Sequence, residues 1–276
     1  MHFIEWPLIG FTLLVQLGIG ILLSAMLIRI LDPKQDRKLY LSAGYWATGF
    51  TLVGMLLSFT HLGTPLKAYN ALSHVGGSWL SNEVFVCSIF LALLILFVAM
   101  ERFQWGTERL RDAMGMVAVF VGLVETYAMS KLYVSSIIPA WNSSYTFVQF
   151  YSTMLVLGTI FMMFLNRKNT EEKSNRYLYG LAFLAVLLEV AFLPGYLSGL
   201  NTGNAAAQAS ASLMHEQSIF LVIRWLLIML GIFVVNLQKF KAKPSLMVGV
   251  VLSVFVGELI GRYVFYATAF PINIGM

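Results

Sequence analysis

Charged side chains are scarce in this sequence. Only 11% of its 276 residues are Asp, Glu, Lys or Arg, whereas 59% are hydrophobic. A typical soluble protein has about 25% charged residues. This scarcity excludes an ordinary soluble domain and indicates that the protein folds in lipid.

Cysteine and histidine are also few. The single Cys87 excludes an internal disulfide or a cysteine-ligated iron–sulfur cluster, and we interpret it as a small buried residue. The four histidines are His2, His61, His74 and His215, and none falls deep within an apolar run. We therefore expect no haem and no metal in this protein, so that any electrons it handles must pass to another subunit.

What the sequence has instead is long apolar runs. About 20 such residues suffice to cross a bilayer as a helix. Eight runs qualify: residues 7–31, 39–60, 82–100, 113–135, 147–166, 177–197, 217–237 and 245–270. They predict an all-α fold, a polytopic membrane helix bundle with eight transmembrane helices, which forms one integral membrane domain over residues 1–276. The first run is longer than the apolar part of a signal peptide, so we expect it to be retained.

The basic residues predict the orientation. With eight spans both termini lie on one side, and 14 of the 18 Lys and Arg residues fall at the ends of spans or in loops on the other side. These residues are Arg29, Lys34, Arg37, Lys38, Arg102, Arg109, Arg111, Arg167, Lys168, Lys173, Arg176, Lys239, Lys241 and Lys243. The positive-inside rule makes these loops cytoplasmic and places both termini outside. Topology thus accounts for the net charge of +5, and we expect membrane lipid, not nucleic acid, as a partner.

Six ionisable residues fall within the predicted spans, where charge is costly and usually faces the protein interior. They are Glu125, Lys131, Glu189, Arg224, Glu258 and Arg262. For Glu125 and Glu189 the alternatives are structural, hydrogen-bonded carboxyls or a proton path.

Glu258 and Arg262 are four residues apart with the acid first, which favours a pair along one helix. Gly257 and Gly261 alternate with them in a pattern typical of close helix packing. In one interpretation these charges only neutralise each other. In the other, Arg262 and Arg224 line the outer end of a ligand cleft.

The segment between the second and third runs carries the strongest functional signal. His61 ends one span and Glu83 begins the next, so both face the same side of the membrane and can share a shallow pocket. We expect Ser81 to cap the third helix and to place Glu83 in its first turn. Taken singly, each residue could instead complement a helix dipole.

A histidine beside a carboxylate suits the oxidation of a hydroquinone. That reaction releases two electrons and two protons, and an imidazole can accept a proton near neutral pH. The aromatic side chains of Tyr69 and Trp79 could pack against the ring and its tail, although aromatic residues are common at membrane interfaces in any case.

Four segments resemble a known family: EWPL (5–8), HLGTPLKAYNAL (61–72), VGGSWLSNE (75–83) and GELIGRYVFY (257–266). They are similar to the anchor subunit of bacterial dimethyl sulfoxide reductase, the DmsC family. The resemblance implies an inner-membrane protein that anchors an iron–sulfur subunit and a molybdopterin catalytic subunit on the periplasmic side. It also implies menaquinol oxidation without haem, with the quinol-site histidine and glutamate at His61 and Glu83.

Other functions remain open from the sequence. The protein could anchor a related molybdopterin reductase, or it could be a scaffold without a quinol site of its own. A transporter or channel would suit the charges within the spans, but the two halves show no matching broken helices. Lys131 departs from the family pattern, which has arginine there.

Overall fold

The computed structural model describes residues 6–61, 74–167, 172–236 and 243–270. Helices joined by short turns make up these ranges. Nine helices occur in them: α1 Trp6–Leu31, α2 Arg37–His61, α3 Trp79–Phe103, α4 Glu108–Val134, α5 Ser144–Leu165, α6 Glu172–Thr202, α7 Ala205–Glu216, α8 Ser218–Asn236 and α10 Pro244–Ala267.

Eight of these helices coincide with the eight apolar runs, and α7 is the additional one. Seven are long and apolar enough to cross a membrane, namely all except α2 and α7. Glycine, serine and threonine interrupt the apolar residues of α2 and lower its hydropathy. The prediction of an all-α, multi-pass membrane protein is therefore confirmed for the described ranges.

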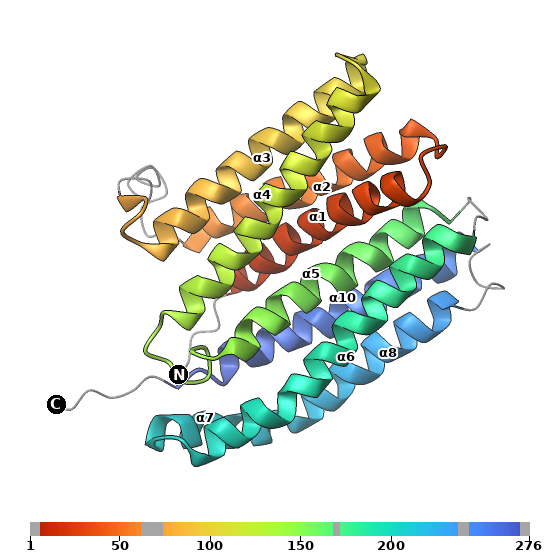
Figure 1. The fold of residues 1–276 in the computed structure, drawn as a ribbon. Helices are drawn as coiled ribbons and strands as arrows, with labels where there is room; N and C mark the ends of the chain where they lie inside the picture. The colour runs from red at the N-terminus through yellow and green to blue at the C-terminus, as the bar shows by residue number, and fades with distance from the viewer. Residues whose placement is uncertain (1–5, 62–73, 168–171, 237–242, 271–276) are drawn as a thin grey trace.

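The helices form an elongated bundle in which α1 and α5 are central (Figure 1). Helix α1 packs along both α2 and α5, while α3 packs on α4, α6 on α5, and α8 on α10. In the most apolar part of each helix, 83% of α1 and 67% of α5 is buried, against at most 44% for the other candidate spans. The centre of the protein is thus the contact between α1 and α5.

Glycine permits that contact. A Cβ atom added at Gly20 of α1 would meet the carbonyl oxygen of Met154 and would lie 2.9 Å from Cα of Gly158 in α5. A Cβ atom at Gly158 would in turn collide with the backbone of Gly20. Because neither residue has a Cβ, the two helix backbones touch directly, as in glycine-mediated helix packing within membranes.

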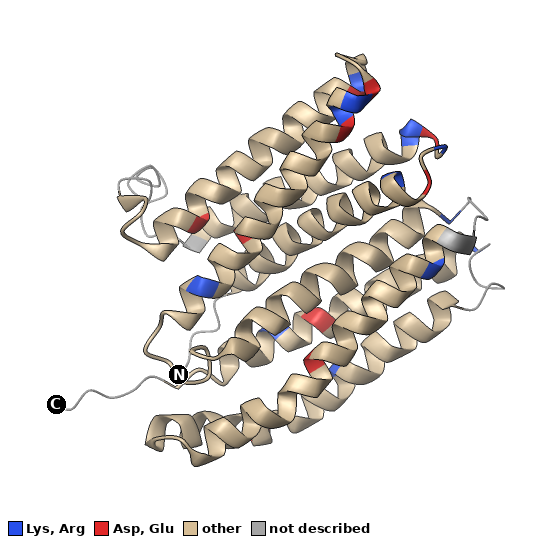
Figure 2. Ribbon diagram, viewed as in Figure 1, with Lys and Arg blue, Asp and Glu red and all other residues tan. Residues whose placement is uncertain are grey.

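Lys and Arg gather at one end of the bundle, where the links α1–α2 and α3–α4 lie (Figure 2). We call this the basic end, and the opposite one the far end. Arg29 of α1 pairs with Asp112 of α4 at 3.1 Å. Arg37 of α2 pairs with Asp112 at 3.1 Å and also with the buried Glu101 of α3. These ion pairs join four helices.

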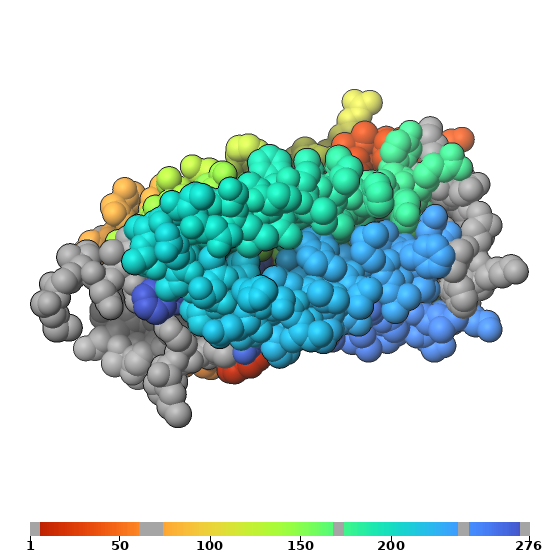
Figure 3. All heavy atoms as spheres, turned by 90° about the horizontal axis from the view of Figure 1, so that it is seen from below, coloured from red at the N-terminus to blue at the C-terminus, as the bar shows by residue number. Residues whose placement is uncertain are grey.

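The outer surface is apolar, as a lipid-facing surface must be. Figure 3 shows a face of the protein on which α6 and α8 lie next to each other. The exposed large side chains of these two helices include Phe183, Leu184, Leu187, Leu188 and Phe192 of α6 and Ile219, Val222, Leu226, Leu230 and Phe233 of α8.

Three local expectations need correction. Helix α3 begins at Trp79 with Ser78 in extended conformation before it, so Ser81 does not cap it and Glu83 lies in its second turn. The preceding turn is held by Asn82, whose side-chain oxygen accepts a hydrogen bond of 2.7 Å from the Gly76 amide. Helix α6 continues past residue 197 to Thr202. The helix that follows it, α7, is rich in alanine and serine and so too weakly apolar to be identified as a run.

Candidate functional site at the far end

The end of α2, the start of α3 and the ends of α4 and α10 all lie at the far end of the bundle (Figure 1). His61 is the last residue of α2, and its side chain lies outside the described residues. Tyr69 lies outside them as well. Of the predicted proton-accepting pair, the structure therefore places Glu83 in full and His61 only by its position at the helix end.

Glu83 is buried, with 3% of its surface exposed. Its position, four residues after Trp79, puts it about 6 Å along α3 from the helix start. One of its carboxyl oxygens, Oε1, has no hydrogen-bond partner among the described residues. A buried carboxyl with a free oxygen is costly for stability and is available to an incoming donor.

Trp79 lies one turn above Glu83 and is half-buried. Its ring meets Tyr127 of α4 edge to face at 6.1 Å, and Nζ of Lys131 lies 5.9 Å from its centroid. Lys131 therefore lies over an aromatic ring in the structure. Tyr127 stacks in turn on Phe147 of α5 at 5.4 Å, which gives this end of the bundle an aromatic wall.

A second buried acid, Glu125 of α4, lies deeper in the same part of the protein. It is fully buried, and neither of its carboxyl oxygens has a hydrogen-bond partner of normal geometry among the described residues. The charge of Glu83 acts on it, and the thiol of Cys87 lies beside it. We call Glu83 and Glu125 the carboxyl pair. The sequence gives no signal that these two acids, on different helices, lie close enough for the charge of one to act on the other.

Tyrosine hydroxyls connect α4 with α10 nearby. Tyr133 and Tyr266 are hydrogen-bonded to each other through their hydroxyl groups. Trp141 packs flat against Phe265 at 5.5 Å and donates its indole N–H to the carbonyl of Phe265 at 2.8 Å. This cluster fixes the last turns of α4 and α10 relative to one another.

Arg262 of α10 is buried and contacts α1 and α5. Its Nη2 donates to the side-chain oxygen of Gln16 in α1 at 2.8 Å. Its guanidinium carbon lies 3.7 Å from the ring centroid of Phe150 in α5, a cation–π contact that partly compensates for burial.

Arg224 of α8 has different partners. Its Nη2 donates to Glu189 of α6 at 2.6 Å and to Glu258 of α10 at 3.4 Å. Thr153 also donates to Glu258, at 2.8 Å. Glu258 is therefore paired with Arg224 across helices and not with Arg262 along its own helix. Gly261 makes this possible, because a Cβ atom there would lie 2.7 Å from the guanidinium carbon of Arg224.

The structure does bring the two predicted arginines together. Both line a cavity of about 10 Å³ with Gln149, Thr153, Glu258, Gly261 and Phe265. That volume holds about one water molecule and no quinone ring. In this structure Arg224 and Arg262 thus shape a polar interior, not a ring-sized cleft.

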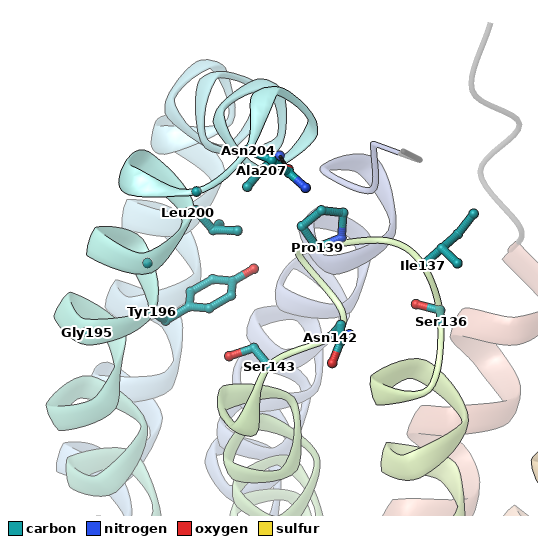
Figure 4. A pocket seen from close by; sticks show the side chains of 12 residues that line it. Ser136, Ile137, Pro139, Asn142, Ser143, Gly195, Tyr196, Leu200, Asn204 and Ala207 are labelled. Carbon is teal, nitrogen blue, oxygen red and sulfur yellow. Dashed lines mark hydrogen bonds between the residues drawn. The ribbon is translucent and has the colours of Figure 1, made fainter. Parts of the chain in front are cut away.

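A larger cavity, which the sequence analysis missed, opens elsewhere at the far end. It measures about 620 Å³ and is lined by the α4–α5 link, including Pro139 and Asn142, and by the end of α6 with Tyr196 (Figure 4). Tyr196 donates its hydroxyl to the carbonyl of Ala140 at 2.9 Å. The size suits a small ligand, but among the described residues no charged side chain lines it, and neither do the predicted site residues Glu83, Trp79, Arg224 and Arg262. The repeat of glycines at 195, 199 and 203 is its signal in the sequence.

Metal ligands do not gather anywhere in the described part of the protein: no group of three or more His, Cys, Asp or Glu side chains there could hold an ion. The chemistry that these residues support is proton transfer, by carboxyls and hydroxyls in an interior of low polarity.

Comparison with known proteins identifies the family. The family model described as DMSO reductase anchor subunit (DmsC) matches residues 1–268. The C subunit of the anaerobic dimethyl sulfoxide reductase of Haemophilus influenzae is 29% identical over 267 residues, which cover 95% of this protein and 94% of that subunit. The subunit of the same name from Escherichia coli is 29% identical over 274 residues with the same coverage, and the anaerobic dimethyl sulfoxide reductase subunit YnfH from that organism is 26% identical over 268 residues. Because the family match extends over nearly the whole sequence, the protein belongs to the family of DMSO reductase anchor subunits.

Proposed function

We propose that this protein is the membrane anchor of a dimethyl sulfoxide reductase-type complex and that it oxidises menaquinol at its far end. In this proposal all eight long helices cross the bacterial inner membrane. The basic end is cytoplasmic, and both termini and the far end are periplasmic. The distribution of Lys and Arg supports this orientation (Figure 2). An iron–sulfur subunit and a molybdopterin catalytic subunit then bind on the periplasmic side.

One observation carries the proposal: the buried carboxyl of Glu83, with an oxygen that has no described partner, lies at the same end of the bundle as the end of α2, which is His61. In the proposed reaction a menaquinol hydroxyl donates its proton to His61. Glu83 accepts a hydrogen bond from the quinol or from the imidazolium and passes protons outward. The two electrons of the quinol are transferred to the iron–sulfur subunit.

The other predicted residues have supporting roles. Trp79, which packs with Tyr127, contacts the quinol ring or tail, and so does Tyr69. In this proposal Arg262 orients a quinone oxygen when the bound quinol widens the cavity of about 10 Å³ beside its guanidinium. Arg224 is already bound to two carboxylates, so we assign it the task of holding α6, α8 and α10 in place behind the site.

The central test replaces each proton acceptor. We expect His61→Arg and Glu83→Gln to lower quinol-dependent reduction by roughly 100- to 10,000-fold, the usual effect of losing a general base. Reduction driven by an artificial dye that feeds electrons directly to the partner subunits should persist, as should their attachment to membranes.

His215→Arg and Glu216→Gln are matched controls, because both residues are exposed and lie in α7 at the same end of the bundle. They should leave quinol activity unchanged. If His61→Arg kept full quinol activity, His61 would have no part in the mechanism.

The location of the reaction has its own consequence. Protons released on the same side as the electron acceptor move no net charge across the bilayer. Proteoliposomes that contain the complex should therefore turn over quinol without generating a membrane potential. A potential that collapses with an ionophore and scales with turnover would contradict a periplasmic site.

A further inference from the structure

The proposed reaction releases two protons: His61 accepts the first, and Glu83 accepts a hydrogen bond and passes protons outward. The described interior contains a second carboxyl that this mechanism does not use. Glu125 lies nine residues before the end of α4, about 13 Å along the helix from the far end, whereas Glu83 lies only about 6 Å from the start of α3. Measured along its helix, Glu125 therefore lies further from the far end than Glu83.

The carboxyl pair has no compensating cation among the described side chains. The ion pairs found there involve other acids. Apart from the thiol of Cys87 beside Glu125, three of the four carboxyl oxygens of the pair have no hydrogen-bond partner among the described residues. Two neighbouring carboxylates in so apolar a place cannot both stay ionised. At rest the pair must hold at least one proton.

The other titratable groups around the pair do not remove that constraint. Cys87 of α3 is buried against Glu125 and near Glu83. Tyr133 of α4 is bonded to Tyr266 of α10, and Arg262 of α10 is directed at Gln16 and Phe150.

From α5, Tyr151 donates its hydroxyl to the carbonyl of Leu123. On α1, the polar groups of this end are the uncharged Thr12 and Gln16. Lys131 of α4 lies over the ring of Trp79, and no ion pair among the described residues joins a cation to Glu83 or Glu125.

We propose that Glu125 acts through Glu83 as a positioning residue that completes a proton store for quinol oxidation. This inference rests on the proposed function. At rest the carboxyl pair shares one proton and carries one negative charge. When a quinol is oxidised, both of its O–H bonds break. One proton goes to His61 and the other to the pair, which becomes neutral, while two electrons pass to the iron–sulfur subunit.

The pair then releases its extra proton to the periplasmic side through Glu83, which lies closer to the far end than Glu125. Neutralising a buried negative charge is favourable in a low-polarity interior, so the pair accepts a proton readily. The charge on the pair before oxidation also keeps the hydrogen-bond acceptor of Glu83 in place for the quinol.

The experiment uses the complete complex with Glu125→Gln, which keeps the size of the side chain and removes its titration. We expect the quinol-dependent kcat to fall at least about tenfold, less than for loss of a direct base, with KM changed by less than about twofold. The dependence of kcat on pH should change shape. Glu125→Asp should recover part of the rate, and dye-driven reduction should be unaffected in both variants.

Infrared difference spectra between the oxidised and reduced complex supply a readout that a structural role would not change. The wild-type protein should show a carboxyl C=O band that responds to deuterium and disappears in Glu125→Gln. Thr126→Val is the matched control, because Thr126 is the buried neighbour of Glu125 and is bonded to the carbonyl of Gly122. It should retain the band and the pH profile.

The outcomes separate the two proposals. If the wild-type complex does not oxidise quinol, both fail. If Glu83→Gln loses quinol oxidation while Glu125→Gln keeps the wild-type kcat, pH profile and infrared band, the proton store is overturned and the proposed function stands.

Discussion

Replacing Arg224 by methionine tests whether the buried charges of α6, α8 and α10 stabilise one another. Arg224 lies 2.6 Å from Glu189 and 3.4 Å from Glu258, and each of these three side chains is at most 3% exposed. Methionine preserves much of the length and apolar volume of the side chain. It removes the cation and leaves two buried carboxyls.

The cost can be worked out from proton uptake. Thr153 still donates to Glu258 in the variant, so Glu189 is the carboxyl expected to take up a proton. An ordinary Glu has a pKa near 4.3, so protonating one at about pH 7 costs about 3.7 kcal/mol, at about 1.4 kcal/mol per pH unit. This agrees with the roughly 3–5 kcal/mol observed when one partner of a buried ion pair is removed.

The difference in free energy of unfolding between the variant and the wild type can be measured in mixed micelles, where titration with a denaturing detergent unfolds the protein reversibly. The folded variant holds one proton more than the unfolded protein, so its free energy of unfolding decreases as pH rises. Between about pH 8 and about pH 6 its deficit relative to the wild type should therefore shrink by about 2.7 kcal/mol.

Lys131→Met is the matched control, because Lys131 is a half-buried cation whose described contact is the ring of Trp79. It should cost about 0.5–1 kcal/mol at either pH. The double variant Arg224→Met/Glu189→Gln should regain part of the stability lost in Arg224→Met. A deficit below about 1 kcal/mol for Arg224→Met, or one that does not change with pH, would refute the idea that the guanidinium is what neutralises these carboxyls.

Two further predictions concern packing. Gly158→Ala should lower the free energy of unfolding by about 1–3 kcal/mol, as overpacking does, because the added carbon collides with Gly20. Gly180→Ala is the control, because space is open there, and it should cause no such loss in thermal unfolding. Equal effects of the two substitutions would count against a tight α1–α5 contact. Trp141→Phe should cost about 1 kcal/mol because the carbonyl of Phe265 loses its donor while the ring stacking persists; unchanged stability would show that another group satisfies that carbonyl.

The sequence was informative about the helices because membrane insertion imposes simple constraints on it. A span needs about 20 apolar residues whatever its neighbours are, so the eight long helices could be located within a few residues. The ends are less certain because turns and caps decide them. Asn82 illustrates this, since its bond to Gly76 accompanies a start of α3 three residues earlier than the apolar run.

The ion-pair partners of buried charged side chains could not be predicted from the sequence. Spacing along one helix favoured Glu258 with Arg262, but the acid is bound by Arg224 from α8. The pairing depends on Gly261, which leaves room for the guanidinium. The GxxxG pattern gave a correct indication of close packing between helices, yet it could not indicate which side chain would use the space.

The two halves of the interior handle charge in opposite ways. In α6, α8 and α10 the described acids Glu189 and Glu258 share the guanidinium of Arg224, so that their burial is compensated. In α3 and α4 the carboxyl pair is buried with three oxygens lacking a described partner, although apolar residues at both positions would be cheaper for the fold. A protein retains such a cost where the group does chemistry. If the proposed quinol oxidation takes place, this difference between the halves favours α3 and α4, and not the arginines, as the place of proton exchange.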